Sequence, residues 1–181
     1  MSVFSKHPGI KVVNKYSGMW DSAAAQKNTA AILPSLPKID GIWAQGGTDG
    51  ILKAFQTAGR PLPPTAGESE NGFRKFMSGE KNGHKLNAFS IGQPTYLVLV
   101  ALEVARRVLQ RGYPRRNVTI PFPSATSSQV KPGLTVFPQV QDSFFTPITD
   151  TTPDHLVSLT LAEVQTGKPT RSRIDVRLPH A

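Results

Sequence analysis

The sequence predicts an α/β fold, a doubly wound and mostly parallel sheet with helices on both faces. Two observations support this class. Short apolar runs rich in β-branched residues alternate with longer helix-like segments, and turns containing glycine or proline separate them. Parallel strands also need a crossover, which is normally a right-handed helix, so this alternation favours a parallel sheet. With 181 residues, 38% of them hydrophobic, the chain is long enough for one globular domain with its own core.

The first β–α unit is expected at residues 10–36. "IKVVNKYS" at residues 10–17 is apolar and β-branched enough for a strand. "DSAAAQKNTAAILPSL" at residues 21–36 follows as a helix, and the side chain of Asp21 or Ser22 can cap its first amides.

A second unit follows directly. "IDGIWAQ" at residues 39–45 predicts a strand, and "GGTDGILKAFQTAG" at residues 46–59 predicts a turn and a helix. Gly59 stands where a helix C-terminal stop is expected.

Two further units and a last strand complete the predicted sheet. "RPLPPTAG" is a weaker strand candidate that precedes the helical "ESENGFRKFMSG", and "HKLNAFSIG" leads to the strong helix "QPTYLVLVALEVARRVLQRG". "NVTIPFPSATS" is expected as the last strand. We place the domain at residues 1–145 and an irregular tail with a short terminal helix at residues 146–181.

The charge balance bears on possible partners. The net charge is +9 and the pI is about 10.1, but the one dense basic group, "RRVLQRGYPRR", has no aromatic platform or nucleic-acid module beside it. We interpret it as a solvated helix face, with a basic docking surface as the alternative, and expect no nucleic-acid partner. The start "MSVFSKHPGIKVV" shows no secretory signal pattern, and "YLVLVAL" is too short to cross a bilayer.

Enzyme chemistry finds little support. The chain has no cysteine, and its four histidines are scattered without metal-ligand spacing. "SGEK" and "SSQVK" contain a Ser-x-x-Lys pattern without its companion motifs, and neither "GGTDG" nor "TGKPT" matches a nucleotide-binding loop. We therefore expect no catalysis, no metal and no cofactor.

The carboxyl ends of parallel strands share one edge of the sheet, where ligands bind. Loops carrying Trp20, Glu68, Asn71 and Gln93 are expected to converge there. An aromatic ring suits the apolar face of a sugar, and carboxylate and amide groups suit its hydroxyls. The alternatives are that Trp20 only closes the sheet edge, that Asp21 is only a cap, and that the glycines of "GGTDG" only allow tight turns.

The residues resemble a known family. The string from "GIKVVNKYSGMWDSAAAQKN" through "IDGIWAQGGTDG", "AFQTAGR" and "GESENGF" to "SIGQPTYLVLVALEVARRVLQRG" resembles the C-terminal lobe of a periplasmic sugar-binding protein of the ribose-binding type. Such a protein is the substrate receptor of an ABC importer. The resemblance covers roughly residues 5–145. It implies one lobe of the type I periplasmic binding protein fold, a monosaccharide or related polyol as ligand, an ABC permease as partner, and a periplasmic location.

The resemblance also implies site residues. Trp20 matches the ring that sandwiches the sugar, Ser22 stands where a cationic ligand residue is expected, and Gly46 stands where an asparagine is common. The hydrogen-bonding carboxylate matches Glu68, Ser69 or Glu70 depending on a one-residue shift, and we favour Glu68. Asn71 is a second candidate in this turn, and Gln93 lies within one position of a hinge-side amide.

The family has two lobes that close on the ligand, and the first lobe has no counterpart in this chain. We therefore expect weak sugar binding by this chain alone. "PFPSATS" and "LTVFP" are expected to expose a sheet edge, and a homodimer through that edge is a hypothesis. The alternative function is the effector-binding lobe of a bacterial transcription repressor of the lac repressor type, without its DNA-binding domain.

Overall fold

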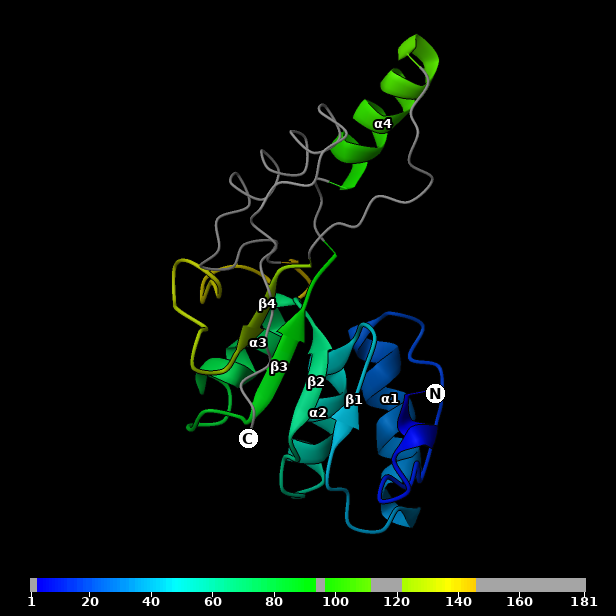
Figure 1. The fold of residues 1–181 in the computed structure, drawn as a ribbon. Helices are drawn as coiled ribbons and strands as arrows, with labels where there is room; N and C mark the ends of the chain where they lie inside the picture. The colour runs from blue at the N-terminus through cyan, green and yellow to red at the C-terminus, as the bar shows by residue number, and fades with distance from the viewer. Residues whose placement is uncertain (1–2, 94–96, 112–121, 146–181) are drawn as a thin grey trace.

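A four-stranded sheet with the order β1-β2-β3-β4 organises the chain (Figure 1). The computed structural model describes residues 3–93, 97–111 and 122–145. The first three strands are parallel, namely β1 (Ile42–Trp43), β2 (Thr65–Glu68) and β3 (Ala88–Ile91). Strand β4 (Ser124–Thr126) runs antiparallel to β3. The predicted α/β class with a mostly parallel sheet is confirmed.

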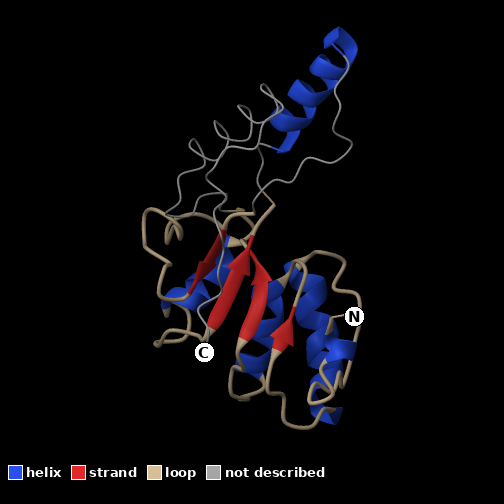
Figure 2. Cartoon of the chain, viewed as in Figure 1, coloured by secondary structure: helices blue, strands red, loops and turns tan. Residues whose placement is uncertain are grey.

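The described residues also form four α-helices and two 3₁₀ turns. The helices are α1 (Ser22–Ile32), α2 (Thr48–Thr57), α3 (Asn71–Ser78) and α4 (Leu97–Arg111), and the 3₁₀ turns are η1 (Phe4–Lys6) and η2 (Leu33–Ser35). Of the helices, α2, α3 and α4 lie between successive strands. Helices α2 and α3 pack on one face of the sheet, and α1 packs against α2 (Figure 2). This order matches the predicted alternation from the second unit onward.

Local sequence signals explain where two of these helices begin and end. The Asp21 carboxylate accepts a hydrogen bond of 2.7 Å from the Ala24 amide, so Asp21 caps α1 as one of the two predicted candidates. Gly59 follows α2 with φ +63°, and the Arg60 amide donates to the Phe55 carbonyl. That left-handed glycine and backward bond form the predicted helix stop.

The hydrophobic core lies between the sheet and the helices α2 and α3. Its buried members are Leu52, Phe73, Phe76, Met77, Leu86, Ala88, Ala125, Val130 and Val136. Arg74 lies inside this core, where burial lowers the pKa of its guanidinium to about 10. Its Nε donates to Ser90 Oγ at 3.2 Å and one terminal nitrogen donates to the Thr135 carbonyl at 2.9 Å. The buried cation therefore joins α3 to β3 and to the loop after β4.

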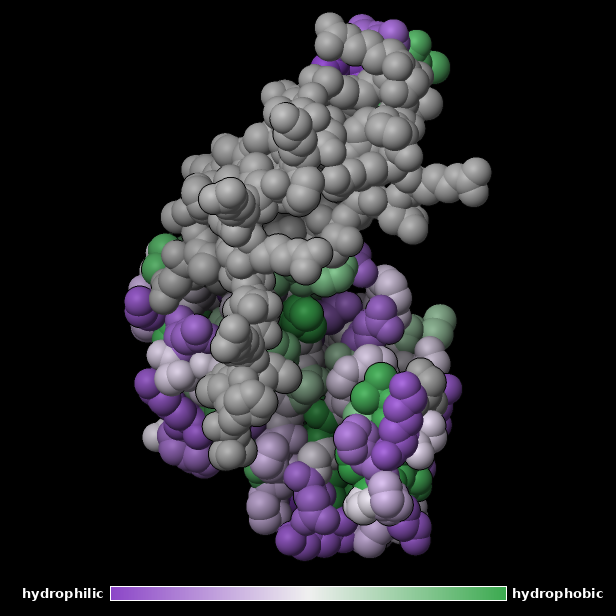
Figure 3. All heavy atoms as spheres, in the orientation of Figure 1, coloured by the Kyte–Doolittle hydropathy of each residue, from purple (hydrophilic) through white to green (hydrophobic). Residues whose placement is uncertain are grey.

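Among the described residues, the face of the sheet opposite to α2 and α3 carries no helix, and we call this face the open side. Helix α4 lies beyond the carboxyl end of β3 (Figure 1). Figure 3 shows hydrophobic side chains on the open side between hydrophilic flanks, and Trp43 and Ile91 are 63% and 41% exposed. A hollow of about 560 Å³ on this side is lined by residues such as Pro64 and Asn87, near the amino ends of β2 and β3. It therefore lies away from the predicted ligand edge.

The predicted strand at residues 10–17 is wrong. These residues have no assigned strand, and Ile10, Val12 and Val13 are between 41% and 50% exposed. β-branched residues favour extended backbone, but a strand forms only when a neighbour completes its hydrogen bonds. No described strand pairs with this segment, so the first predicted β–α unit contributes only its helix to the fold.

The segment after β4 consists of turns and isolated bridges up to residue 145, as expected for a proline-rich stretch. The predicted tail at residues 146–181, with its short helix, lies outside the described residues.

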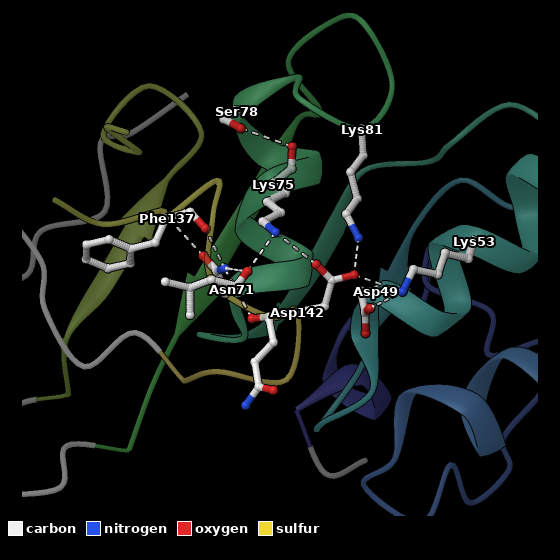
Figure 4. A network of polar contacts seen from close by, with 10 residues as sticks. Asp49, Lys53, Asn71, Lys75, Ser78, Lys81, Phe137 and Asp142 are labelled. Carbon is white, nitrogen blue, oxygen red and sulfur yellow. Dashed lines mark hydrogen bonds and ion pairs between the residues drawn. The ribbon is translucent and has the colours of Figure 1, made fainter. Parts of the chain in front are cut away.

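The carboxylate of Asp142, in the segment after β4, forms ion pairs with three lysines of α2, of α3 and of the turn after α3 (Figure 4). Asp142 pairs with Lys53 at 3.1 Å, with Lys75 at 3.2 Å and with Lys81. Lys53 also pairs with the buried Asp49 at 2.7 Å. Partial burial raises the pKa of Asp142, but the hydrogen bonds from Lys81, Lys53 and Lys75 outweigh it and hold the pKa well below its ordinary value.

A depressed carboxyl pKa contributes stability above the unfolded-state value of about 4, and this contribution is lost as the pH falls below it. We expect Asp142→Asn to lower the free energy of unfolding at pH 7 by about 1 kcal/mol, since the network is partly solvent-exposed. The variant should also lose less stability than the wild type between pH 5 and pH 2, roughly the range of carboxyl titration. Urea denaturation across this range measures both effects.

The control is Asp40→Asn, because Asp40 forms an exposed pair with Lys38 in which the side chains are 79% and 89% exposed. This variant should leave the acid dependence unchanged. Identical acid dependence of Asp142→Asn and the wild type would contradict the role assigned to Asp142.

Candidate functional site

The candidate site lies at the carboxyl edge of the parallel strands, where ligands bind in open α/β sheets. The loops that leave β1, β2 and β3 meet there, together with the loop that enters α1. We call this set of residues the rim, and it comprises residues 19–21, 44–47, 68–70 and 92–93.

Trp20 is held at the rim in a strained conformation. Met19 and Trp20 have φ values of 55° and 56°, which are rare for residues with side chains. Trp20 remains 68% exposed although its backbone lies directly against Gly46. A Cβ atom on Gly46, which has φ +78°, would lie 3.2 Å from the Trp20 Cα. Strain of this kind is commonly stored at functional sites, so the exposed ring is a strong candidate for ligand contact.

The Glu70 carboxylate holds the start of α2 in place. Helix α2 begins after Gly47, whose φ of 65° is left-handed and which has no side chain to cap the helix. Glu70 replaces that cap, since its two carboxylate oxygens accept from the Gly47 amide at 2.7 Å and from the Thr48 amide at 3.0 Å. This contact joins the end of β2 to the start of α2.

Glu70 is only 6% exposed, and its environment acts on its pKa in both directions. Burial raises the pKa of Glu70, the two amide hydrogen bonds lower it, and the charges of Asp49 and Glu68 raise it further, so the net direction is upward. Among the described residues, the buried carboxylate is therefore compensated by backbone donors and not by a cation.

Glu68 differs from Glu70 although it lies only two positions away. It ends β2 on the side of the sheet opposite to α2 and α3, where it is half-buried. Burial raises the pKa of Glu68. Among the described residues its carboxylate has neither a hydrogen bond nor an ion pair, which leaves it available to a ligand.

Gln93 and Ser22 occupy different parts of this region. Gln93 follows β3 and is exposed. Ser22 begins α1, and its backbone touches α2: a Cβ on Gly50 would lie 1.9 Å from the Ser22 carbonyl oxygen. Its position therefore fixes the contact between the two helices.

Asn71 lies away from the rim. It is fully buried at the start of α3, and its side chain binds the loop after β4. The side-chain nitrogen donates to the carbonyls of Phe137 and Val140 at 2.8 and 2.9 Å, and the side-chain oxygen accepts from the Phe137 amide at 2.9 Å. Because its amide is engaged on both sides, we do not include Asn71 in the proposed ligand site.

Sequence reasoning left Glu70 as one alternative for the ligand carboxylate and did not identify its role at α2. A signal for that role exists in "GGTD", because a helix that starts after two glycines lacks a capping side chain and needs an acceptor from elsewhere.

The described part of the chain has neither a membrane-spanning helix nor a metal-binding cluster. Within it, no helix combines the length and apolarity needed to cross a membrane. In the same residues, no group of three or more potential metal-binding side chains is found.

The chain belongs to the periplasmic binding protein domain family, whose model matches residues 1–113. The fold agrees with two solved structures. An ABC transporter solute binding protein from Thermobispora bispora superposes with a TM-score of 0.65 at 23% identity, covering 94% of this chain and 51% of that one. A crystal structure from Mycobacterium smegmatis gives a TM-score of 0.58 at 20% identity, covering 70% of this chain and 43% of that one. No curated protein matches the sequence.

The chain matches only part of each of these two solved structures. The chain spans about half the length of the two solved structures, 51% and 43% respectively. The fold expected from the resemblance, a partial periplasmic binding protein of type I, is therefore confirmed.

The different surroundings of Glu70 and Glu68 predict different effects of truncation. Glu70→Ala leaves two amides at the start of α2 without their acceptor, so the free energy of unfolding should fall by about 2 kcal/mol. Glu68→Ala removes a carboxylate without a described partner and should change it by less than about 0.5 kcal/mol. Chemical denaturation at pH 7 of both variants makes the comparison, and equal losses would contradict the assignment of Glu70 as the cap of α2.

Proposed function

We propose that this chain is the solute-recognition lobe of an ABC transporter substrate-binding protein and that its solute is a sugar or related polyol. Membership of the periplasmic binding protein domain family supports a solute-binding role, and one similar solved structure is an ABC transporter solute binding protein. The same likeness supports a receptor over the effector-binding lobe of a transcription repressor. An ABC permease as partner and an extracytoplasmic location belong to this proposal.

The observation that carries the proposal is the exposed Trp20 ring, held by strained backbone on Gly46. An exposed indole offers a flat apolar surface for the C–H face of a sugar ring. The free carboxylate of Glu68 and the exposed amide of Gln93 supply hydrogen-bonding groups for hydroxyls. The proposed site therefore consists of Trp20, Gly46, Glu68 and Gln93, with Ser22 fixing α1 beside them.

This arrangement favours recognition over catalysis. The two rim glutamates have distinct tasks, since Glu70 caps α2 and Glu68 is free, and no acid–base pair with a nucleophile accompanies them among the described residues. One lobe contacts a solute from one side only, so we expect millimolar affinity, because tight binding of a small ligand requires burial of most of its surface.

A comparison of the two tryptophans tests the proposed function. Trp20→Ala should weaken binding of the preferred sugar by roughly three- to tenfold, as expected for loss of an aromatic contact. Trp43→Ala is the matched control, since Trp43 is similarly exposed at 63% but its ring contacts Phe4. Saturation-transfer NMR with a panel of pentoses, hexoses and polyols measures both. Equal binding by Trp20→Ala and the wild type, or no binding of any sugar by the wild type, would contradict the proposal.

We also propose weak self-association through the outer edge of β4. Strand β4 is the last of the sheet, and one of its backbone donors is already protected, since the Thr126 amide donates to Gln129 Oε1 at 2.9 Å. Such protection of an edge limits pairing between chains. Gln129→Ala should therefore increase the dimer fraction measured by light scattering over a concentration series. A monomer at every concentration, for both the wild type and the variant, would contradict self-association.

A further inference from the structure

We infer that the rim selects its solute by charge: it favours a polyhydroxy solute that carries an amino group over the neutral analogue, and it rejects anionic analogues. This inference rests on the proposed function, because it names the charge class of the solute at the same site.

The carboxylate of Glu68 has no hydrogen-bond or ion-pair partner among the described residues. Strand β2 buries Thr65 and Gly67 against the helices, and Ala66 and Glu68 point to the open side. Glu68 is paired in register with Ile91 of β3, so an apolar side chain lies beside it in the sheet. A half-buried negative charge without a donor is unfavourable, and a solute that brings a positive charge or several donors relieves this cost.

Both helix starts near the rim are already occupied by carboxylates of the chain. Glu70 accepts from the Gly47 and Thr48 amides at the start of α2, and Asp21 accepts from the Ala24 amide at the start of α1. Free amides at a helix N-terminus are the usual backbone site for a phosphate or carboxylate group. Here an anionic solute meets two occupied helix starts and the charge of Glu68.

The lysines of the described ion pairs are paired with carboxylates other than those of the rim glutamates. The described ion pairs are formed by Lys38 with Asp40, and by Lys53, Lys75 and Lys81 with Asp49 and Asp142. Within the described residues, none of these cations pairs with Glu68 or Glu70. Although the net charge of the chain is +9, none of these described ion pairs places a cation on a rim glutamate.

A fluorescence measurement tests the charge of the rim without any solute. The chain has two tryptophans, so Trp43→Phe leaves Trp20 as the only one and Trp20→Phe leaves Trp43. Collisional quenching by caesium and by iodide at equal ionic strength reports the sign of the local field. We expect a higher caesium-to-iodide quenching ratio for Trp20 than for Trp43, and a lower ratio for Trp20 when Glu68→Gln is added. A higher iodide preference at Trp20 would overturn the inference.

A matched set of solutes then tests selection itself. Glucosamine, glucose and glucose 6-phosphate share one ring and differ in charge, and saturation-transfer NMR ranks their affinities. We expect glucosamine to bind roughly two- to fivefold more tightly than glucose, glucose 6-phosphate to bind most weakly, and Glu68→Gln to remove the advantage of glucosamine. Tighter binding of the phosphate, or equal binding of all three, would overturn the inference but leave sugar recognition standing. No binding of any sugar, in the wider panel as well, would overturn the proposed function, and the quenching ratios would still decide the charge of the rim.

Discussion

The contact between the Glu70 carboxylate and the first amides of α2 is the interaction on which the candidate site depends. Glu70 lies 23 residues after Gly47 and 22 residues after Thr48, so this contact joins the end of β2 to the start of α2 across a long stretch of sequence. The Gly47 amide is one of the two donors, and the neighbouring Gly46 lies against Trp20. The position of the exposed indole therefore depends on a largely buried carboxylate, and loss of this contact would release Gly46, Gly47 and the Trp20 ring.

The side chains of residues 68–71 have different surroundings, although they are close neighbours in sequence. Glu68 faces the open side of the sheet, Glu70 turns inward to α2, and Asn71 is buried under the loop at residues 137–141. Side chains alternate between the two faces of a strand, and this alternation ends where the chain enters α3. A shift along this segment thus exchanges the proposed ligand residue Glu68 for a buried structural one, which explains why the sequence alone left Glu68, Ser69 and Glu70 as alternatives.

Local rules predicted the parts of the fold that local interactions determine. The cap at Asp21 and the stop at Gly59 follow from side-chain and backbone preferences that act within a few residues. The expected strand at residues 10–17 failed because pairing depends on a distant neighbour that propensity does not specify. The place of α4 depends on distant contacts as well, since the alternation of strands and helices predicts that α4 exists but not where it packs. The capping role of Glu70 joins residues far apart in sequence, so it emerged only from the fold.

Amide hydrogen exchange of Gly47 and Thr48 tests this dependence most directly. Near the start of a helix, amides without an acceptor exchange almost freely, whereas amides bonded to a buried carboxylate are protected. We expect protection of both amides comparable to that of the core residues of α2, and loss of this protection in Glu70→Ala while the amides of β3 stay protected. Rapid exchange of Gly47 and Thr48 in the wild-type protein would contradict the central place given to Glu70.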